Sequence, residues 1–598
     1  MMHVEENNNK REMKDSFIIK RLMRYAIPYK WLFILTFVLV IVAVGVQLFQ
    51  PWIFGEIFEV FEEPGFSMKT VLYLLTVYFS ITLISSVTSY FQQIILQKAG
   101  QGIIYDIREE VFNHMEDQSI DYLNNQPTGV LVTRITNDTN TLSEMYTSVM
   151  VNMTRDLLTV VGIIGALIVI NIKSSGDAKL AFAIIGVIPV LLVSSYFFRK
   201  VSRGIYREVR KNLARTNAFL SEHLSGMKIV QIFNQEDEKM EQFKDINRDL
   251  RKTQLQQILA FAVYRPTIYL LHIGAITIIF FYGGFQVIDG ILSISLIITF
   301  KTYVDRLFEP IQMLAEQFNI LQSALASSER IFGILDTKST ITQAENPIEI
   351  PEMKGRIEFK NVWFSYLEDE WILRDVSFTI EPGQSFAFVG ATGAGKTTIL
   401  KLITRDYDIQ KGQILVDGID VKNIALPSLR KHIGVMLQDV FMFSGTIESN
   451  IRLKDESITQ EEMEEACKYV NATHFIDQLP KRYDEEVNER GMNYSQGQRQ
   501  LLSFARTLVH KPSVIILDEA TANIDTETEQ LIQDSLNKMM SIGTMLIVAH
   551  RLSTIQHVDK IVVLHKGKIK EIGSHQDLLK QRGMYYNLYQ IQYKERPN

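Results

Sequence analysis

The chain has 598 residues, of which 46% are hydrophobic and 22% charged, and its mean hydropathy is +0.04. These values are apolar for a soluble protein and too polar for one that lies wholly in lipid, so they favour a mixed architecture. A net charge of −6 gives no general attraction to nucleic acid, and a single cysteine, Cys467, excludes an internal disulfide framework and a Cys-cluster metal site.

Long apolar intervals in the first half of the chain predict membrane-spanning helices. No charged residue falls between Lys30 and Glu56 or between Lys69 and Lys98, and each interval exceeds the roughly 20 residues that cross a bilayer. Further apolar intervals bring the predicted total to six spans. These lie at 157–172, 180–198, 266–288 and from 290 onward, the last being interrupted at Lys301.

The charges that flank the predicted spans indicate their orientation. Residues 1–30 hold seven Lys or Arg, whereas the loop 56–69 holds four Glu and one Lys. Because cytoplasmic flanks carry the excess of Lys and Arg, the N-terminus is predicted to be cytoplasmic. Six spans then return the chain to the cytoplasm, which predicts a multi-pass protein of the cell membrane whose C-terminal half lies in the cytoplasm.

Two polar segments between predicted spans, roughly 97–150 and 199–260, combine dense charge with few Pro or Gly. This composition is typical of helices that continue past the bilayer into water. The tips of these hairpins, near 122–129 and 217–226, are predicted to contact a cytoplasmic domain and to transmit its movement. The alternative is that both are merely solvated hairpins.

Ionisable residues interrupt the predicted sixth span, where Arg306 and Glu309 accompany Lys301 and Asp305. Lys301 and Asp305 are four residues apart and therefore share a helix face, and His272 lies in the predicted fifth span. At membrane depth such residues usually face the protein interior, a partner charge or a water-filled cavity, so Lys301, Asp305 and His272 are candidate substrate-cavity residues. The alternatives are a structural ion pair or snorkelling for the first two, and packing for His272.

The polar stretch 336–355, which contains two prolines, predicts a linker between a transmembrane domain, 1–335, and a soluble domain, 356–598. Apolar runs separated by helical stretches follow it, which indicates crossover units and a largely parallel sheet. The predicted strands are 357–362, 385–389, 434–437, 514–517, 545–548 and 560–564. The predicted fold class is therefore multidomain: an all-α six-helix transmembrane domain with long cytoplasmic helical extensions, followed by an α/β nucleotide-binding domain with a phosphate loop.

That phosphate loop is the stretch 390–398, Gly-Ala-Thr-Gly-Ala-Gly-Lys-Thr-Thr, which stands between an apolar strand and a helical segment. Three glycines let the backbone curl so that amide groups and a helix N-terminus point at one place, which favours phosphate. Lys396 is expected to reach the β- and γ-phosphates of ATP, and the Thr397 hydroxyl to ligate Mg²⁺. The predicted nucleotide-binding residues of the loop are Gly390, Gly393, Gly395, Lys396, Thr397 and Thr398.

Other strand ends supply the remaining groups that an ATPase needs. Asp518 and Glu519 end the strand 514–517, where Asp518 is predicted to hold Mg²⁺ through water and Glu519 to orient and polarise the attacking water. His550 is predicted to donate to the γ-phosphate, where the transition state spreads negative charge, and Gln438 to reach Mg²⁺ or the attacking water. Tyr366 is predicted to stack on adenine. The catalytic candidates are thus Glu519, His550, Gln438 and Lys396, and the Mg²⁺ candidates are Thr397, Gln438 and Asp518.

This arrangement resembles the nucleotide-binding domain of an ATP-binding-cassette (ABC) transporter, and six spans fused before it resemble a half-size exporter that works as a dimer. The stretch 494–498, Tyr-Ser-Gln-Gly-Gln, is similar to the family signature, usually written L-S-G-G-Q. The resemblance implies that Ser495, Gly497 and Gln498 form a second phosphate cradle, which serves ATP bound by the partner subunit. It also implies that Asp525 belongs to a loop that crosses the dimer interface.

Two further segments match the family by resemblance alone. Residues 486–491 resemble the segment that senses the transmembrane half, with Asn488 where a Gly is usual, and the two hairpin tips resemble the coupling helices. ATP binding is then expected to close the dimer and to switch the membrane cavity from inward-open to outward-open, and hydrolysis to reset it.

The signature departs from the family pattern, because Gln496 replaces a Gly and Tyr494 replaces Leu, while Glu519 and His550 are intact. A side chain at 496 is expected to crowd the cradle offered to the partner's ATP. The sequence therefore favours the hydrolysis-competent half of a heterodimer whose other subunit lacks the catalytic Glu. The opposing interpretation is a homodimer in which Gln496 is harmless.

The function predicted from these features is ATP-driven export of amphipathic, lipophilic small molecules, that is, multidrug efflux, with ATP and Mg²⁺ as cofactors. Its expected partners are a second half-transporter subunit, the lipid bilayer and a lipophilic substrate. A lipid flippase, a homodimeric exporter of another lipophilic compound and a peptide exporter are alternatives within the class. A soluble cassette ATPase acting on DNA or ribosomes is disfavoured by the apolar intervals, and an importer by the fusion of both halves in one chain.

Overall fold

The computed structural model describes residues 13–62, 67–174, 185–367, 370–437, 439–518, 526–548 and 555–594. Contacts divide the chain into two units: a helical unit, Met1–Glu116 with Thr128–Thr337, and an α/β unit, Asp117–Pro127 with Lys338–Asn598. The tip of the first polar hairpin thus groups with the α/β unit. The predicted domain boundaries, at 335 and 355, remain a prediction.

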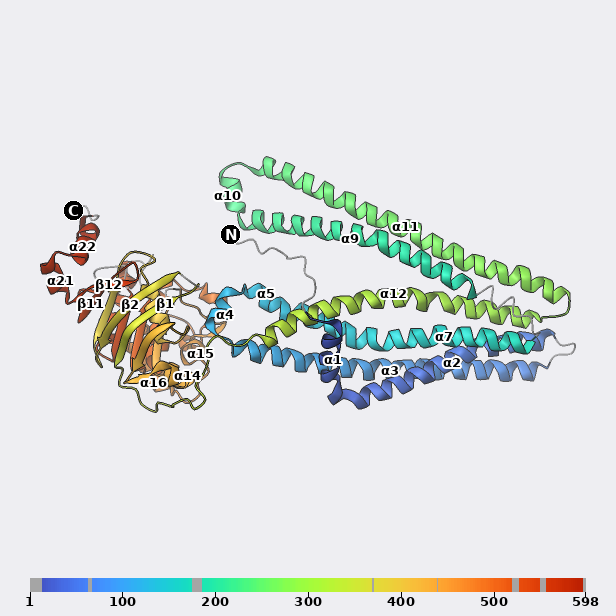
Figure 1. The fold of residues 1–598 in the computed structure, drawn as a ribbon, viewed down its shortest axis with the longest axis horizontal. Helices are drawn as coiled ribbons and strands as arrows, with labels where there is room; N and C mark the ends of the chain where they lie inside the picture. Colours follow the sequence, from blue (N-terminus) through green and yellow to red (C-terminus); the bar gives the residue numbers. More distant parts are fainter. Residues whose placement is uncertain are drawn as a thin grey trace. The chain divides into compact units, whose positions relative to one another are not determined.

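The helical unit is built from long helices that run beside one another (Figure 1). α2, α3, α7 and α12 pack along one another, and α9 and α11 form a hairpin with α10 at its tip, in which α11 also packs against α12. The helices of this unit are α1 (Asp15–Ala26), α2 (Lys30–Glu62), α3 (Met68–Glu116), α5 (Thr128–Thr133), α6 (Thr139–Glu144), α7 (Met150–Ser174), α9 (Val187–Ser225), α10 (Met227–Ile232), α11 (Glu236–Ile288) and α12 (Ile294–Asp336).

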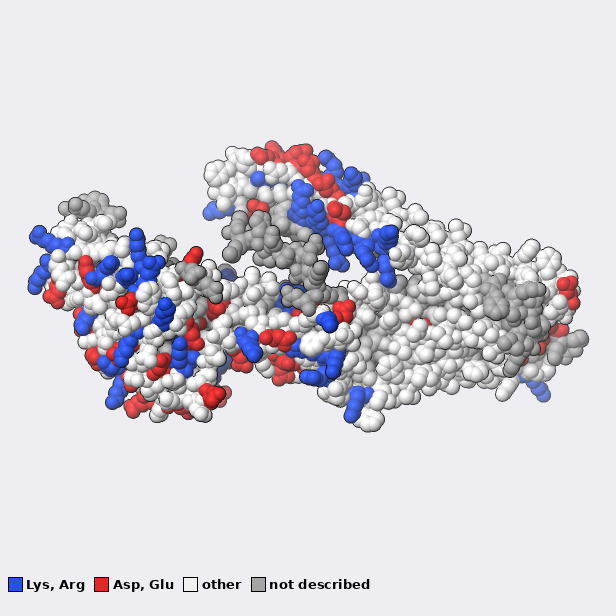
Figure 2. Space-filling view, viewed as in Figure 1, with Lys and Arg blue, Asp and Glu red and all other residues white. Residues whose placement is uncertain are grey.

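Within the described ranges, four helices are long and apolar enough to cross a membrane: Asp15–Glu62, Met68–Glu116, Thr128–Ile170 and Glu236–Ile288. They contain the predicted first, second and fifth spans and most of the third. The predicted fourth span begins outside the described ranges, and the predicted sixth lies in α12. Figure 2 shows a broad stretch of the helical unit whose visible face is almost free of charged residues, with Lys, Arg, Asp and Glu gathered toward its two ends. This distribution is the one expected of a surface that faces lipid.

A proline explains how α12 is attached to α2. Pro51 lies inside α2 and has no N–H, so the carbonyl of Gln47, one turn earlier, loses its helical partner. The guanidinium of Arg306 donates to this carbonyl oxygen at 2.7 Å and to the Gln50 side chain at 2.8 Å. Tyr303 donates to the neighbouring carbonyl of Leu48 at 2.6 Å. Arg306, one of the ionisable residues that interrupt the predicted sixth span, therefore satisfies backbone that would otherwise stay unpaired in an apolar environment.

A buried carboxylate joins α12 to the return arm of the first hairpin. Asp138 is 4% exposed and ends a π-helical turn, Arg134–Asp138. It accepts hydrogen bonds from Arg134 at 2.8 Å and from Ser327 at 2.9 Å, and it forms an ion pair with Arg330. Two guanidinium groups and a hydroxyl thus compensate for the desolvation of this carboxylate.

In the part of the α/β unit that the structure describes, the strands form three sheets. Figure 1 shows several of these strands side by side. A four-stranded antiparallel sheet has the order β2-β1-β4-β5, a six-stranded sheet has the order β12-β11-β3-β10-β9-β6, and β7 pairs with β8. In the six-stranded sheet, β11, β3, β10, β9 and β6 run parallel and β12 is antiparallel, which confirms the largely parallel sheet predicted from sequence. The strands are β1 (Ile357–Ser365), β2 (Trp371–Ile380), β3 (Ser385–Val389), β4 (Lys411–Val416), β5 (Ile419–Asp420), β6 (Ile433–Met436), β7 (Gly445–Thr446), β8 (Glu486–Val487), β9 (Val514–Asp518), β10 (Thr544–Val548), β11 (Lys560–His565) and β12 (Lys568–Gly573).

Helices and apolar side chains cover both faces of the six-stranded sheet. Phe386 and Phe388 of β3 belong to one buried cluster, and Ala387 and Val389 belong to another. Side chains alternate across a strand, so the sheet is buried on both faces, as is typical of parallel sheets. The helices of this unit are α4 (Ile120–Asn125), α13 (Lys396–Ile403), α14 (Leu426–Lys431), α15 (Ile447–Arg452), α16 (Gln460–Tyr469), α17 (Thr473–Ile476), α18 (Gln496–Val509), α19 (Thr526–Met539), α21 (His575–Gln581) and α22 (Met584–Lys594).

The segment 338–355 is docked on the α/β unit. The fully buried guanidinium of Arg405 donates to the carbonyl oxygen of Thr342 at 2.8 Å, and the backbone N–H of Ile350 donates to Ser428 at 2.9 Å. Thr340 donates to Ser119 at 2.9 Å, which ties the same segment to the tip of the first hairpin. Hydrogen bonds within the α/β unit therefore connect this hairpin tip to segment 338–355, and this segment to Arg405 and to Ser428 of α14.

Candidate functional site

The phosphate loop, 390–398, leads from β3 into α13. Gly390 has a φ of +150° and Gly395 a φ of +102°, both in the region that favours glycine. A Cβ atom on Gly390 would lie 2.3 Å from the carbonyl oxygen of Leu564, and one on Gly395 would lie 2.6 Å from the Leu373 side chain. The glycines are therefore needed for the loop to curl against β11 and β2, which places the N-terminus of α13 at its mouth.

Lys396 opens α13 and is only 6% exposed. Its ammonium group donates to the carbonyl oxygens of Gly390 at 2.9 Å and Ala391 at 3.2 Å, so it lies over the loop backbone. A largely buried ammonium needs acceptors, and phosphate oxygens are stronger ones than neutral carbonyls. In this position the ammonium group can exchange the two carbonyl oxygens of the loop for phosphate oxygens when a nucleotide binds.

Two oxygen ligands meet beside the loop. The Thr397 hydroxyl lies 3.4 Å from a carboxylate oxygen of Asp518, the last residue of β9. A hydroxyl and a carboxylate are hard oxygen ligands that fit Mg²⁺, and both were predicted for this role. When bound, Mg²⁺ would neutralise phosphate charge at this edge of the sheet.

Tyr366 follows β1 and lies against α13. Its hydroxyl is 3.2 Å from that of Thr398, and its ring makes edge-on contacts with Phe364 and Tyr407. These contacts fix the orientation of the ring and leave part of it exposed. A fixed, partly exposed ring near the phosphate loop is suited to stacking on a base.

Four predicted site residues, Gln438, Glu519, Asp525 and His550, lie outside the described ranges. The strands that precede three of them are neighbours in the sheet: β10 pairs with β3 and β9, and β9 pairs with β6. Val548 pairs with both Phe388 and Asp518, so the carboxyl ends of β3, β10 and β9 are adjacent. The chain thus leaves β6, β9 and β10 at the edge of the sheet that carries the phosphate loop.

The signature stretch forms the start of α18. Ser495 caps this helix: its side chain accepts the N–H of Gln498 at 3.2 Å, and the Gln498 side chain accepts the N–H of Ser495 at 2.9 Å. Gly497 is buried, whereas Gln496 is exposed at the first position of the helix. The hydrogen bonds of Ser495 stay within the first turn of α18, and the N-terminus of this helix is a second place where amide groups can meet phosphate.

In the helical unit, the three predicted cavity residues form one cluster. Asp305 of α12 lies 2.6 Å from the Lys301 ammonium and 2.9 Å from Nε2 of His272 on α11. The carboxylate is therefore held between two cationic or hydrogen-bonding partners. The same contacts form an i,i+4 ion pair within α12 and join α12 to α11. They are therefore compatible both with a structural ion pair and with a role in a substrate cavity.

A cavity of about 240 Å³ lies beside this cluster between α11 and α12. It is lined by Tyr264, Arg265, Ile268, Tyr269, His272, Phe308 and Gln312. Aromatic rings, a guanidinium and an amide give it both apolar and polar character, as is common in small-molecule sites. His272 both lines this cavity and contacts Asp305, which places the candidate cluster at the cavity wall.

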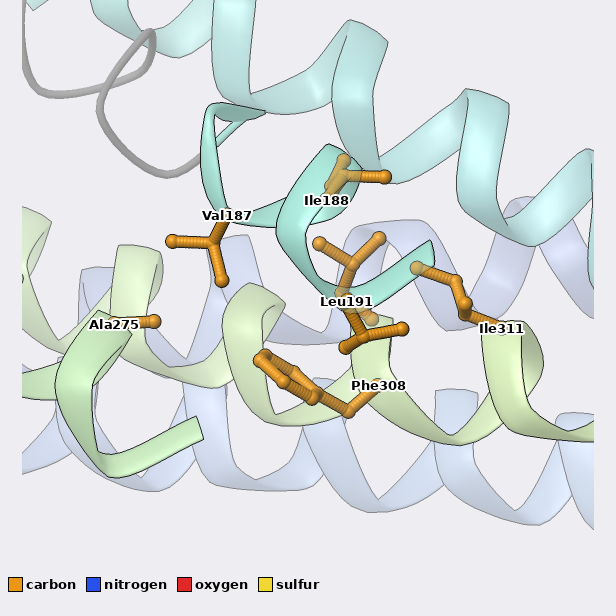
Figure 3. Close-up of a pocket in the computed structure, with 7 residues that line it drawn as sticks. Val187, Ile188, Leu191, Ala275, Phe308 and Ile311 are labelled. Atoms are coloured by element: carbon orange, nitrogen blue, oxygen red, sulfur yellow. The ribbon is translucent and has the colours of Figure 1, made fainter. Parts of the chain in front are cut away.

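A second space in the helical unit is much smaller and is lined by apolar side chains alone. Figure 3 shows apolar side chains of α9, α11 and α12 converging on it. Its volume is about 10 Å³, near the lower limit for one water molecule. It is a packing gap rather than a place for a substrate, and its lining residues are Val187, Ile188, Leu191, Ala275, Leu307, Phe308 and Ile311.

One contact near the signature was not predicted from the sequence. Tyr494, which stands where the signature usually has Leu, donates its hydroxyl to the carbonyl oxygen of Glu486 at 3.2 Å. The only sign of this contact in the sequence is the departure from the signature at that position, because the partner is a backbone atom in a neighbouring segment.

Comparisons with known proteins agree with this geometry. Residues 33–311 match the family model of the ABC transporter transmembrane region, and residues 373–522 match the ABC transporter model. The first match covers the long helices up to the middle of α12. The second covers the phosphate loop, the signature and Asp518.

Relatives and a solved structure extend the similarity over nearly the whole chain. A probable multidrug resistance ABC transporter ATP-binding/permease protein of Bacillus subtilis is 37% identical over 540 residues, 90% of this chain and 79% of the relative. An ATP-dependent lipid A-core flippase of Syntrophus aciditrophicus is 36% identical over 515 residues, 86% of this chain and 84% of the relative. The structure of a bacterial Atm1-family ABC exporter with ATP bound has a TM-score of 0.77 and 26% identity, covering 94% of this chain and 98% of that one.

Proposed function

The chain belongs to the ABC transporter family, as a membrane-spanning exporter subunit that hydrolyses ATP, and from this premise we propose that it exports amphipathic, lipophilic small molecules as half of a dimer. The observation that carries the proposal is the meeting of Lys396, Thr397 and Asp518 at one edge of the parallel sheet, in the same chain as the apolar helices. ATP hydrolysis at this edge supplies the free energy, and alternating access of the helical unit moves the substrate.

The roles of the site residues are part of the proposal. Lys396 binds the β- and γ-phosphates, and Tyr366 stacks on adenine. Thr397 and Asp518, together with Gln438, hold Mg²⁺, whose charge reduces repulsion between the phosphates and the attacking oxygen. Glu519 orients and polarises the attacking water, and His550 donates to the γ-phosphate oxygen as negative charge develops.

The tip of the second hairpin supports a dimer. It exposes apolar side chains, with Leu224 66% exposed, Ile229 64% and Phe233 68%. Large apolar side chains that are exposed together at the end of a polar hairpin favour a protein interaction site, and its proposed occupant is the α/β unit of the partner subunit. The family resemblance of the signature at the start of α18 supports the same assembly. In it, the cradle of the signature and the loop of Asp525 are proposed to meet ATP held by the partner.

The N-terminal cations support a cytoplasmic α/β unit, since residues 1–30 carry seven Lys or Arg.

The second subunit is proposed to differ from this chain. Support for a heterodimer comes from Gln496, an exposed side chain at the point where the family signature has a glycine.

The cavity beside His272 supports a lipophilic substrate with a polar group. Tyr264, Tyr269 and Phe308 offer aromatic surface, while Arg265 and Gln312 offer hydrogen-bond donors. The name of the Bacillus relative supports multidrug efflux in particular. The relatives named lipid A-core flippases support a second candidate, in which the substrate is a lipid that moves between leaflets.

The test uses the chain, by itself and together with a candidate partner subunit, reconstituted in lipid nanodiscs, and a panel of cationic, neutral and anionic amphiphiles. Efflux of lipophilic compounds predicts that several of them raise the ATPase rate, and that Asp305→Asn changes which compounds do so. A lipid flippase predicts that the rate depends on the phospholipid or lipopolysaccharide supplied and not on the panel. An ATPase rate that no compound and no lipid changes would contradict both candidates.

A further inference from the structure

The segment 486–491 and the signature stretch are joined by side chains that the proposed ATPase mechanism does not use. Asn493 donates its amide N–H to the carbonyl oxygen of Glu486 at 2.8 Å, and its amide oxygen accepts the N–H of Asn488 at 3.1 Å. This one side chain binds a backbone acceptor and a backbone donor, as a neighbouring strand would. Segment 486–488 is therefore anchored to the residue that precedes Tyr494.

Tyr494 adds a second hydrogen bond to the same backbone oxygen. Its side chain is 7% exposed and packs edge-on against Phe475, with ring centroids 6.2 Å apart. From this position the phenol donates to Glu486 at 3.2 Å. Burial raises the pKa of Tyr494, so the phenol keeps its proton and remains a donor at neutral pH. A leucine, the usual residue, would fill the same apolar position and could not make this bond.

The far end of the segment is attached to α18 as well. Arg499, on the second turn of the helix, donates to the carbonyl oxygen of Arg490 at 3.2 Å. Arg490 and Gly491 have φ values of +57° and +65°, so the chain turns sharply there. A Cβ atom on Gly491 would lie 3.0 Å from the Arg499 side chain, so the turn lies directly against the helix. Both ends of segment 486–491 are thus tied to the helix that presents Ser495.

The other side of the segment is tied to the loop that follows Gln438. β8 pairs with β7, with Gly445 opposite Val487. The preceding loop is held by Asn450, which exchanges hydrogen bonds of 2.8 Å with the backbone N–H and C=O of Phe443. Phe441 and Phe443 remain exposed at the end of this loop. Hydrogen bonds between β7 and β8, and from Tyr494 to Glu486, therefore connect the loop that exposes these two aromatic side chains to the residues before α18.

We propose that Tyr494 is a positioning residue, whose hydroxyl transmits displacement of segment 486–491 to Ser495 and the N-terminus of α18. This proposal rests on the proposed function, in which the start of α18 meets ATP bound by the partner subunit. The phenol of Tyr494 links the backbone of Glu486, in β8, to the residue immediately before the helix cap Ser495. A shift of β8 therefore changes the position of the phosphate cradle at the start of α18. The packing of the Tyr494 ring alone would hold α18 in place without following that shift.

The test compares Tyr494→Phe, which keeps the ring and removes the hydroxyl, with a matched control. Tyr469→Phe removes a phenol that donates to a backbone carbonyl oxygen of Lys538 at 2.9 Å, elsewhere in the same unit. In nanodiscs that hold this chain alone, so that any shared ATP site meets a signature with Tyr494, Tyr494→Phe is expected to lower the kcat of the ATPase roughly three- to tenfold, the effect of losing one hydrogen bond, with the KM for ATP within twofold. Tyr469→Phe is expected to match the wild type.

Hydrogen exchange gives a readout that does not depend on a transport substrate. In Tyr494→Phe the backbone amides of 486–491 are expected to exchange at least threefold faster, with those of α16 unchanged. Equal kcat and equal exchange in Tyr494→Phe and the wild type would overturn the inference. A wild type that no amphiphile stimulates would count against the proposed function instead, and the exchange rates and the unstimulated kcat of Tyr494→Phe would then decide the role of the hydroxyl.

Discussion

At the scale of single residues, the proposed ATP site combines a lysine ammonium that can change acceptors with oxygen ligands at fixed positions. The Lys396 ammonium is held by two backbone carbonyls, and Asp518 is fixed at the end of a buried strand. Carbonyl oxygens are neutral, so a triphosphate can replace them as acceptors for Lys396 at little cost. The arrangement favours a site that is formed by the fold and completed by the nucleotide.

Glu519 follows Asp518 directly and is the proposed water-orienting residue. Glu519→Gln is expected to slow ATP hydrolysis by about two orders of magnitude or more, because positioning and charge stabilisation carry most of phosphoryl transfer. The affinity for a fluorescent ATP analogue is expected to stay within about threefold, since Lys396 and the loop are unchanged. A matched control is Glu461→Gln, at an exposed position of α16. Turnover by Glu519→Gln close to that of the control would show that another group orients the water.

Cys467 gives a prediction about chemical reactivity. It is fully buried in the α/β unit, and burial raises the pKa of its thiol to about 12. A raised pKa means that the thiol stays protonated below that pH, so on the order of one part in 10⁴ is thiolate at pH 8. The native protein is therefore expected to resist alkylation by iodoacetamide at pH 8, and the denatured protein to react fully, as measured by intact mass. Rapid labelling of the native chain would contradict this burial.

At the scale of elements, the two hairpins differ in their partners. The tip of the first hairpin bonds to segment 338–355 through Ser119 and Thr340, within the α/β unit. The tip of the second hairpin exposes its apolar side chains. The first hairpin tip thus bonds within its own chain, whereas the second exposes an apolar surface. Two hairpins of this kind are suited to link two subunits.

Ile229→Glu tests this difference. A carboxylate at an apolar contact loses solvation when the contact forms, so amphiphile-stimulated ATPase is expected to fall roughly tenfold, equivalent to about 1.4 kcal/mol. Leu213→Glu is the matched control, because Leu213 is also exposed but lies about three turns from the tip on α9. Equal rates in the two variants would show that the second tip carries no coupling contact.

Elements and local motifs could be predicted from the sequence, whereas their long-range contacts could not. The phosphate loop needs only glycines, a lysine and flanking strand and helix patterns, all within a short stretch. The hydrogen bond from Arg306 to the carbonyl of Gln47 joins residues 259 positions apart, and only the loss of the N–H at Pro51 indicates that this carbonyl is available. Side-chain bonds to backbone oxygens leave no pattern in sequence, since any residue supplies the acceptor.

The same limit applies to the cluster of Lys301, Asp305 and His272 and to the predicted linker. The spacing of Lys301 and Asp305 predicts a shared helix face, but the contact with His272 depends on how α11 packs on α12. The polar composition of 336–355 predicts a linker, yet its docking depends on Arg405 and Ser428, which are distant in sequence. Composition predicts whether a segment can be exposed, and tertiary contacts decide what it touches.

At the scale of the whole molecule, the proposed dimer makes ATP hydrolysis depend on what faces the start of α18. Gln496 is exposed at this helix N-terminus, where a glycine would leave the amide groups accessible to phosphate. In a homodimer, both ATP sites would meet a cradle that carries Gln496. In a heterodimer, the site built on Glu519 of this chain would meet the partner's signature, and Gln496 would face the other site.

The chain purified by itself therefore distinguishes the two assemblies. The heterodimer predicts that it hydrolyses ATP slowly and without cooperativity, and that Gln496→Gly raises its rate at least roughly fivefold by opening the cradle, about 1 kcal/mol of transition-state free energy. Glu519→Gln added to Gln496→Gly should abolish the gain, which shows that the rate belongs to this chain. Fast, cooperative hydrolysis by the unmodified chain, with no response to Gln496→Gly, would instead establish that two copies form a working exporter and that a side chain at position 496 leaves the phosphate cradle open.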